Sequence, residues 1–268
     1  MEKISLVDNN LKVSKFIYGT SRIHHIFSKK ERQKILSEAI ECGFTHFDTS
    51  PLYDYGIAEK ELGILTKSHP NITITSKFGI YAPGKTQKSD WEIYVRKSGG
   101  KLIPALSRVE KNFDTKMARK ILTSSLRRLN KECIELFMLH EPPENFINLS
   151  ETLDSLNHLK SPGLIREFGV SGRWITLKQI YLKAPEILKV VQTRDEEGVP
   201  FADLEKFNGI TRFFAYGNGK SSPYAELSYL DRIRFALRRN ICGAIIVSTN
   251  KVNRISQYDK LLGIQSDS

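Results

Sequence analysis

The sequence contains little cysteine and no long apolar run. Its 268 residues include three cysteines, and Cys42, Cys133 and Cys242 are too far apart to form the short spacings of a metal site. Their apolar or helical surroundings predict reduced thiols in the core. No segment reaches the roughly 20 apolar residues of a membrane helix, and Met1 to Asn10 lack the apolar stretch of a signal peptide. We therefore expect a soluble, cytoplasmic protein with no membrane partner and no metal site.

Acidic residues are fewer than basic ones. Asp and Glu number 30 against 41 Lys and Arg, which gives a formal net charge of +11. A polyanionic partner is one explanation, but basic and acidic residues are mixed almost throughout, and no basic stripe with interleaved aromatics is present. We expect no nucleic-acid partner. The densest basic stretch, Lys85 to Lys120, has two interpretations: it binds an anionic substrate or a cofactor phosphate, or it is a solvated face.

Length and patterning predict one α/β barrel. The chain is 40% hydrophobic, and short β-branched or aromatic runs alternate with helical patterns, as in repeated βα units. Eight such units close into a (β/α)8 TIM barrel, so we expect residues 1–268 to form a single barrel domain. The predicted strands are 15–18, 45–48, 72–77, 134–140, 167–171, 188–192, 211–216 and 243–248.

Two helices have clear boundary signals. Ser28 and Glu31 form a capping-box pair before an apolar periodic run, and Gly43 ends that run. Asp114 begins the second helix, where Ile121 to Leu129 carries an apolar stripe that indicates core packing.

Two regions depart from a regular barrel. Ala202 to Phe207 leaves room for only a stub of helix, so the barrel is predicted to be abbreviated around strands six to seven. Residues 78–113 are longer than an ordinary connection and are predicted to be an elaborated loop insert beside the active site.

Four titratable residues fall where such barrels collect reactive groups, at or just after the carboxyl ends of strands. Asp48, Lys77 and His140 end the second, third and fourth strands, and Tyr53 lies in the loop after the second. A phenol has a pKa near 10, and a neighbouring ammonium stabilises its phenolate. Each residue alone is more often structural. Together they favour carbonyl reduction, with Asp48 holding Lys77, His140 orienting the substrate, and a nicotinamide supplying hydride, which no side chain can do.

Three segments resemble the aldo-keto reductase family. The segment FDTSPLYDYGIAEKELG, from Phe47 to Gly63, resembles the motif around the family's catalytic Asp and Tyr. ITSKFG from Ile74 and LFMLHEP from Leu136 resemble the segments that carry its Lys and His. The resemblance extends, with gaps, from about Gly19 to Gln257, and the wording is most similar to bacterial and plant sugar or pyridoxal dehydrogenases. It implies an oxidoreductase that reduces an aldehyde, ketone or sugar carbonyl, or oxidises the corresponding alcohol.

The resemblance also implies a cofactor site. By that similarity Gly19 and Thr20 lie near the nicotinamide, and Ser171 and Gln192 hold its carboxamide. Tyr216 stacks on the nicotinamide ring, and Thr249 and Arg254 contact the adenosine 2′-phosphate. An Arg with a hydroxyl favours NADPH over NADH, which is the alternative. Thr249 has a second interpretation, as the cap of the following helix.

Several positions depart from the family pattern. Gly172 stands where the family generally has an Asn, and the loops after Gln192 and Tyr216 differ from the common wording. The family's carboxyl-terminal loop is nearly absent, which predicts an open substrate site unless residues 78–113 cover it. These changes keep a noncatalytic NADP(H)-binding scaffold or sensor as the alternative function.

Overall fold

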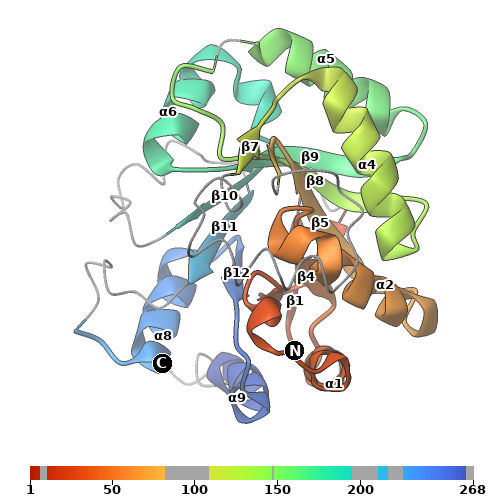
Figure 1. Ribbon diagram of the computed structural model, residues 1–268. Coiled ribbons are helices and arrows are strands. Elements are labelled where there is room, and N and C mark those ends of the chain that lie inside the picture. The colour runs from red at the N-terminus through yellow and green to blue at the C-terminus, as the bar shows by residue number, and fades with distance from the viewer. Residues whose placement is uncertain (7–10, 82–108, 147, 195–210, 217–225, 264–268) are drawn as a thin grey trace, which may run out of the picture.

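The computed structural model describes residues 1–6, 11–81, 109–146, 148–194, 211–216 and 226–263, with the backbone alone described for 211–216 (Figure 1). The strands are β1 (Lys3–Leu6), β2 (Leu11–Ser14), β3 (Phe16–Gly19), β4 (His46–Asp48), β5 (Thr73–Phe78), β6 (Ile80–Tyr81), β7 (Glu110–Lys111), β8 (Ile134–His140), β9 (Ile165–Ser171), β10 (Val190–Arg194), β11 (Thr211–Tyr216) and β12 (Ala244–Val247). The α-helices are α1 (Lys29–Glu41), α2 (Ile57–Ser68), α4 (Thr115–Leu129), α5 (Leu149–Lys160), α6 (Trp174–Lys183), α8 (Tyr229–Arg239) and α9 (Val252–Gly263), with 3₁₀ turns η1 (Ile23–His25), η2 (Tyr53–Gly56) and η4 (Pro185–Ile187).

Eight parallel strands close into a barrel in the order β10-β11-β12-β3-β4-β5-β8-β9. The helices surround it (Figure 1). All eight predicted strands are confirmed, with ends that differ by no more than two residues. The carboxyl ends of parallel strands meet at one end of a barrel, so this order brings the ends of β4, β5 and β8 together as neighbours.

Both predicted helices are confirmed. The hydroxyl of Ser28 accepts a hydrogen bond from the Glu31 N–H at 3.4 Å and caps α1. The carboxylate of Asp114 accepts from the Lys116 N–H at 2.7 Å and caps α4. The expected stripe of α4 is buried.

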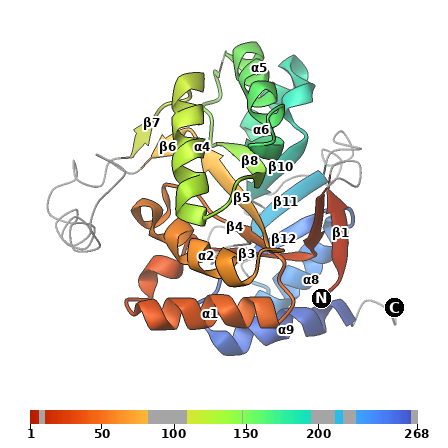
Figure 2. The ribbon, with the colours of Figure 1, turned by 90° about the vertical axis from the view of Figure 1, so that its right-hand side faces the viewer.

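The amino-terminal hairpin was not predicted from the sequence. β1 and β2 pair antiparallel, and their buried residues Leu6, Leu11 and Val13 form one cluster with side chains inside the barrel: Ile17, Leu136, Met138, Val190, Ala244 and Ile246. These barrel residues point to the same side of their strands as Gly19, His140 and Gln192 do, because alternate residues of a strand point to one side. The hairpin therefore packs against the amino-terminal end of the barrel interior. In Figure 2, β1 lies at the opposite end of the molecule from β6 and β7.

Two sequence expectations fall outside the described residues. These are the abbreviated stretch Ala202 to Phe207 and most of the insert, where residues 82–108 are not described. The insert begins and ends in the described part as the short antiparallel pair β6–β7. Within the described part of the chain, no helix is long and apolar enough to cross a membrane.

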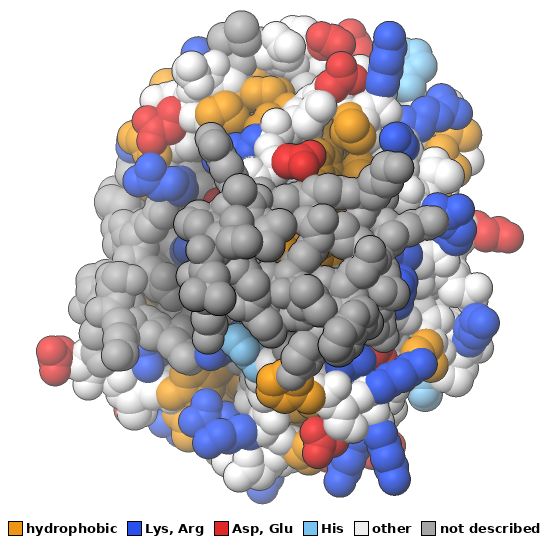
Figure 3. Space-filling model, viewed as in Figure 1, with side chains coloured by type: hydrophobic (Ala, Val, Ile, Leu, Met, Phe, Trp, Pro, Cys, Tyr) orange, Lys and Arg blue, Asp and Glu red, His pale blue; other side chains and the backbone are white. Residues whose placement is uncertain are grey.

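The expectation of core cysteines is wrong. All three thiols are free, but Cys42 and Cys133 are only half-buried and Cys242 is exposed. Local apolar neighbours in sequence do not decide burial, because Cys242 lies at the outer turn between α8 and β12. On the face seen in Figure 3, the described Lys and Arg side chains are spread around the periphery and mixed with Asp and Glu.

Candidate active site

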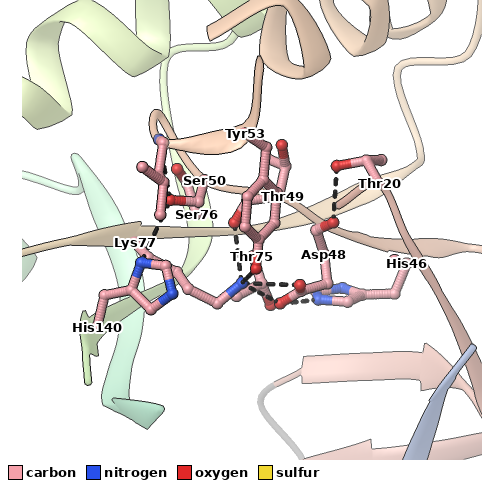
Figure 4. Close-up of polar contacts among 12 residues, drawn as sticks. Thr20, His46, Asp48, Thr49, Ser50, Tyr53, Thr75, Ser76, Lys77 and His140 are labelled. Carbon is pink, nitrogen blue, oxygen red and sulfur yellow. Dashed lines mark hydrogen bonds and ion pairs between the residues drawn. The ribbon is translucent and has the colours of Figure 1, made fainter. Parts of the chain in front are cut away.

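A buried ion pair joins the carboxyl ends of β4 and β5. The Lys77 Nζ donates to both carboxylate oxygens of Asp48, at 2.7 and 2.6 Å, and to the Thr49 carbonyl at 3.0 Å. An ammonium has three donors, and the remaining neighbour is the Tyr53 hydroxyl at 3.4 Å. Figure 4 shows the Lys77 ammonium between Tyr53 and Asp48.

The strands beneath this pair are tied together by a buried histidine. The two ring nitrogens of His46 each lie 2.7 Å from a threonine hydroxyl on β5, those of Thr73 and Thr75. Burial lowers the pKa of His46 to about 3, so the ring is neutral and both nitrogens are satisfied. The histidine therefore fixes β4 against β5, and with them Asp48 against Lys77.

A tight left-handed turn presents Tyr53. Asp54 and Tyr55 both have a φ of 55°, and Gly56 follows with a φ of 85°. Left-handed backbone costs about 1–2 kcal/mol for a residue other than glycine, so the turn is strained. It reverses the chain directly after Tyr53, and α2 then begins at Ile57.

His140 completes the set from β8. Its ring meets the ring of Tyr53 edge-on, with centroids 6.1 Å apart. The Nδ1 atom lies 3.4 Å from the Ser50 hydroxyl, which fixes the ring orientation. The structure thus brings together all four residues that the sequence predicts as catalytic.

Burial dominates the proton affinities of these groups. It raises the pKa of Tyr53 above its ordinary value; the Lys77 ammonium opposes this shift, and the charges of Asp48 and Glu141 add to it. Burial also raises the pKa of Asp48, against the pull of Lys77. The expectation of a phenol made acidic by lysine is therefore wrong in net direction, since dehydration of the phenolate outweighs the ammonium.

The same environment acts on the two bases. Burial opposes the charge of Lys77, but attraction to Asp48 and Tyr53 outweighs it and raises the lysine pKa. Burial lowers the pKa of His140 well below its ordinary value, and Lys77 and Arg194 lower it further. His140 is therefore neutral near pH 7, and Lys77 is charged.

A cavity of about 680 Å³ opens above the tetrad. Six of the residues that the sequence assigns to catalysis or cofactor binding line it: Gly19, Asp48, Tyr53, His140, Ser171 and Gln192. Lys77 lies beneath it, 1% exposed. Within the described chain, no group of three or more His, Cys, Asp or Glu side chains could hold a metal ion.

Two features of the cavity fit a nicotinamide. The Gln192 Oε1 is buried without a hydrogen-bond partner among the described residues, and a buried unpaired carbonyl is costly unless a ligand donates to it. A carboxamide N–H is such a donor. A Cβ at Gly19 would lie 2.6 Å from the Ser248 hydroxyl, so any other residue there would have to displace a side chain of the cavity lining.

The other assigned cofactor residues lie outside the described lining. Thr20 is buried, and its hydroxyl donates to the Asp48 carbonyl at 3.0 Å. Thr249 accepts from the Lys251 N–H at 3.1 Å, in a turn that ends just before α9 begins at Val252. The Arg254 guanidinium lies over the Tyr229 ring at 5.3 Å. Tyr216 ends β11, and its side chain is outside the described part.

The charged rim of this cavity was not predicted from the sequence. Arg22, Glu141, Arg173 and Arg194 line it, and each lies within three residues of the carboxyl end of a barrel strand. The signal that could have found them is their position one to three residues beyond predicted site residues.

Comparison with known proteins gives a family match and several relatives. The model of the aldo/keto reductase family matches residues 15–196. The chain is 25% identical over 220 residues to an uncharacterized oxidoreductase, YqkF, of Bacillus subtilis (strain 168), which covers 79% of this chain and 64% of the relative. It is 32% identical over 140 residues to the NADH-specific methylglyoxal reductase of Escherichia coli (strain K12), which covers 50% of this chain and 39% of the relative. It thus spans less than two thirds of the length of each.

The solved structures agree on the fold. An aldo-keto reductase from Klebsiella pneumoniae in complex with NADPH superposes with a TM-score of 0.67 at 17% sequence identity, covering 98% of this chain and 90% of that chain. A family match over more than half of the residues, together with this barrel, means that the chain belongs to the aldo/keto reductase family of oxidoreductases.

Proposed function

We propose that this protein reduces the carbonyl group of an aldehyde, ketone or sugar, or oxidises the corresponding alcohol, with NADPH as cofactor and NADH as the alternative. One observation carries the proposal. The Tyr53 hydroxyl lies 3.4 Å from a buried Lys77 ammonium that Asp48 holds through both carboxylate oxygens, at the base of the cavity. Relatives that bind NADPH or act on methylglyoxal support it.

The cofactor, when bound, supplies hydride to the carbonyl carbon. Gly19 and Thr20 would border its nicotinamide, Ser171 and Gln192 would hold the carboxamide, Tyr216 would stack on the ring, and Thr249 and Arg254 would contact the 2′-phosphate. Among the described side chains, the unpartnered Oε1 of Gln192 gives the strongest support.

The chain's own residues move and hold the proton. Tyr53 donates its hydroxyl proton to the carbonyl oxygen as negative charge develops there. Lys77 stabilises the phenolate that remains, and Asp48 keeps the ammonium in place. His140, neutral near pH 7, orients the carbonyl oxygen by a hydrogen bond. A tyrosine with a raised pKa keeps its proton until the carbonyl oxygen becomes basic enough to take it.

The Tyr53→Phe variant tests this assignment. We expect kcat for NADPH-dependent aldehyde reduction to fall by about 10²- to 10⁴-fold, the usual contribution of a general acid. The dissociation constant for NADPH, measured by fluorescence quenching, should change little, because the phenol is not a main cofactor contact.

Tyr55→Phe is the matched control, since it removes a hydroxyl from the same turn outside the cavity lining. It should turn over like the wild type. Full activity of Tyr53→Phe contradicts the mechanism. NADPH binding without oxidation across a panel of aldehydes and sugars, in the wild type, favours the noncatalytic scaffold instead.

A further inference from the structure

Two arginines lie side by side at the rim of the cavity. Ser171 on β9 pairs in register with Gln192 on β10, and Arg173 and Arg194 each lie two residues further on. The Gly172 N–H continues the pairing by donating to the Gln192 carbonyl at 3.0 Å, and Arg173 has extended backbone. Alternate residues of extended chain point to one side, and neighbouring strands are about 4.8 Å apart. Arg194 therefore points to the same side of β10 as Gln192, and Arg173, the residue before α6, lines the same cavity beyond Ser171.

Their ion pairs in this structure are weak ones. The Arg173 Nη1 lies 3.2 Å from a carboxylate oxygen of Glu144, and the Arg194 Nη2 lies 3.4 Å from one of Glu141. The two arginine side chains are 63% and 62% exposed, and exposed pairs contribute about 0–1 kcal/mol. By contrast, the structural Arg128 is 10% exposed and binds Glu59 at 2.6 Å. Exchanging either of these ion pairs for contact with a ligand would therefore cost little.

Positive charge is in slight excess among the described residues that line the cavity: they include Arg22, Arg173 and Arg194 against Asp48 and Glu141, and Glu144 outside the lining pairs with Arg173. Asp48 is already neutralised by Lys77, and Arg22 lines the cavity from the loop after β3, across the barrel from β9 and β10. The charge of Arg194 reaches the reaction centre, because it is one of the causes that lower the pKa of His140, after burial and Lys77. Arg194 lines the same cavity as His140, the side chain that we assign to the carbonyl oxygen, and so does Glu141, whose charge raises the pKa of Tyr53.

We propose that Arg173 and Arg194 form a clamp for an anionic group on the substrate, so that the preferred substrate is a small carbonyl compound that carries a carboxylate or a phosphate. This inference rests on the proposed function and names its substrate class. Guanidinium groups bind both anions through paired N–H donors. The clamp takes no part in bond making: it positions the anion while the carbonyl lies toward His140 and Tyr53.

A cofactor phosphate is the other source of such an anion. The residues assigned to the 2′-phosphate, Thr249 and Arg254, follow β12, which β11 separates from β10. Ser171 and Gln192, two residues before the arginines, are assigned to the uncharged carboxamide. The clamp therefore faces the substrate side of the cavity.

Matched substrate pairs test the clamp. We would measure kcat and KM with NADPH for 4-oxobutanoate against butanal, and for glyceraldehyde 3-phosphate against glyceraldehyde. The enzymes are the wild type, Arg173→Gln, Arg194→Gln, the double variant and Arg166→Gln. Arg166 is exposed on the same strand as Ser171, near its other end, and serves as the matched control.

The readout is the ratio of kcat/KM for the anionic substrate to that for its neutral partner. We expect the ratio to exceed one in the wild type, to fall about tenfold in each single variant and further in the double variant, mainly through KM, because an ionic hydrogen bond is lost each time. Arg166→Gln should keep the wild-type ratio. Glu144→Gln, which removes the ion pair between Glu144 and Arg173, should raise it.

A binding measurement separates this proposal from the proposed function. Calorimetric titration of the protein with succinate and with inorganic phosphate, each in the presence of NADPH, needs no turnover. Binding that is lost in the double variant supports the clamp, even if no carbonyl is reduced and the proposed function fails. Reduction of neutral aldehydes with an unchanged ratio in the double variant overturns the clamp alone. A matching loss of NADPH affinity in the double variant also overturns it, because the arginines would then bind the cofactor.

Discussion

Tyr53 is subject to competing influences of burial and charge. The Lys77 ammonium alone favours the phenolate, but burial is the larger effect, and the carboxylates of Asp48 and Glu141 act in the same direction as burial. The net result is a phenol that remains protonated at physiological pH. For a residue that has to deliver a proton, this is the useful form.

The pH dependence of carbonyl reduction should reflect these shifts. Tyr53 is protonated in the active form. Because its pKa is raised, activity is lost at a pH above the ordinary phenol pKa of about 10. His140 has a lowered pKa, so its neutral form persists below its ordinary value of about 6.5. We expect kcat to stay flat from about pH 6.5 to 9 and to fall only at higher pH. Rate profiles at constant ionic strength check this, and a fall in kcat between pH 7 and 8 would contradict it.

At the level of residues, the sequence shows identity and order but not surroundings. Asp48, Tyr53, Lys77 and His140 could be predicted because each ends a strand or follows one, and parallel strands share an edge. The left-handed Tyr55 could not, since tyrosine has no preference for that conformation. Arg173 and Arg194 could not be paired either, because their adjacency depends on the register between β9 and β10.

Among the elements, α2 does most to hold the tyrosine turn in place. Glu59 in its first turn is fully buried; it accepts from the Ser76 hydroxyl on β5 at 2.7 Å and from the Arg128 Nε on α4 at 2.6 Å. Ser76 directly precedes Lys77. One carboxylate thus connects the helix after Tyr53 with the strand that carries its lysine.

Glu59→Gln should destabilise the fold markedly. The amide keeps the shape of the side chain but leaves the buried Arg128 without its counter-charge, which typically costs about 3–5 kcal/mol. The free energy of unfolding in urea should fall by this amount. Lys60→Gln is the control on the same helix: Lys60 is exposed, so a change within about 0.5 kcal/mol is expected. A loss below about 1 kcal/mol for Glu59→Gln would show that the pair contributes little.

Elements with strong local signals were the ones that the sequence predicted well. The strands of the barrel are apolar runs, and α1 and α4 have side-chain caps that the structure retains. The β1–β2 hairpin has only a few apolar residues, Leu6, Leu11 and Val13 among them, and their partners lie inside the barrel. The alternation of Ile4 and Leu6, and of Leu11 and Val13, with polar residues is a local signal for two strands, but it does not show that their packing partners lie inside the barrel.

The molecule as a whole depends on a close approach between β9 and β10. A Cβ at Gly169 would lie 2.1 Å from the Val190 carbonyl oxygen, so β10 can take its place only beside a glycine. The β9–β10 ladder joins only Val170 with Val191 and Ser171 with Gln192. Both the closed barrel and the cofactor side of the cavity therefore depend on this short contact.

Gly169→Ala should consequently lower the melting temperature and weaken NADPH binding together. The added methyl group has to displace the backbone of Val190, and overpacking of this kind costs about 1–3 kcal/mol. Gly172→Ala is the matched control for stability, because its Cβ would meet Pro142 at an ordinary 3.6 Å. Thermal unfolding with and without NADPH measures both effects. Equal melting temperatures for the two variants would contradict the prediction, because the backbone near Gly169 would then accommodate the methyl group without loss of stability.

The hairpin of β1 and β2 bears on the order in which ligands bind to and leave the cavity. The hairpin covers the amino-terminal end of a barrel interior that side chains already fill, and the described cavity lies at the carboxyl ends of the strands. A dinucleotide whose carboxamide contacts Gln192 would lie deeper in the cavity than a substrate held at the rim. The cofactor would therefore have to bind first and leave last. Turnover would then follow an ordered mechanism, in which the alcohol product leaves before the oxidised cofactor.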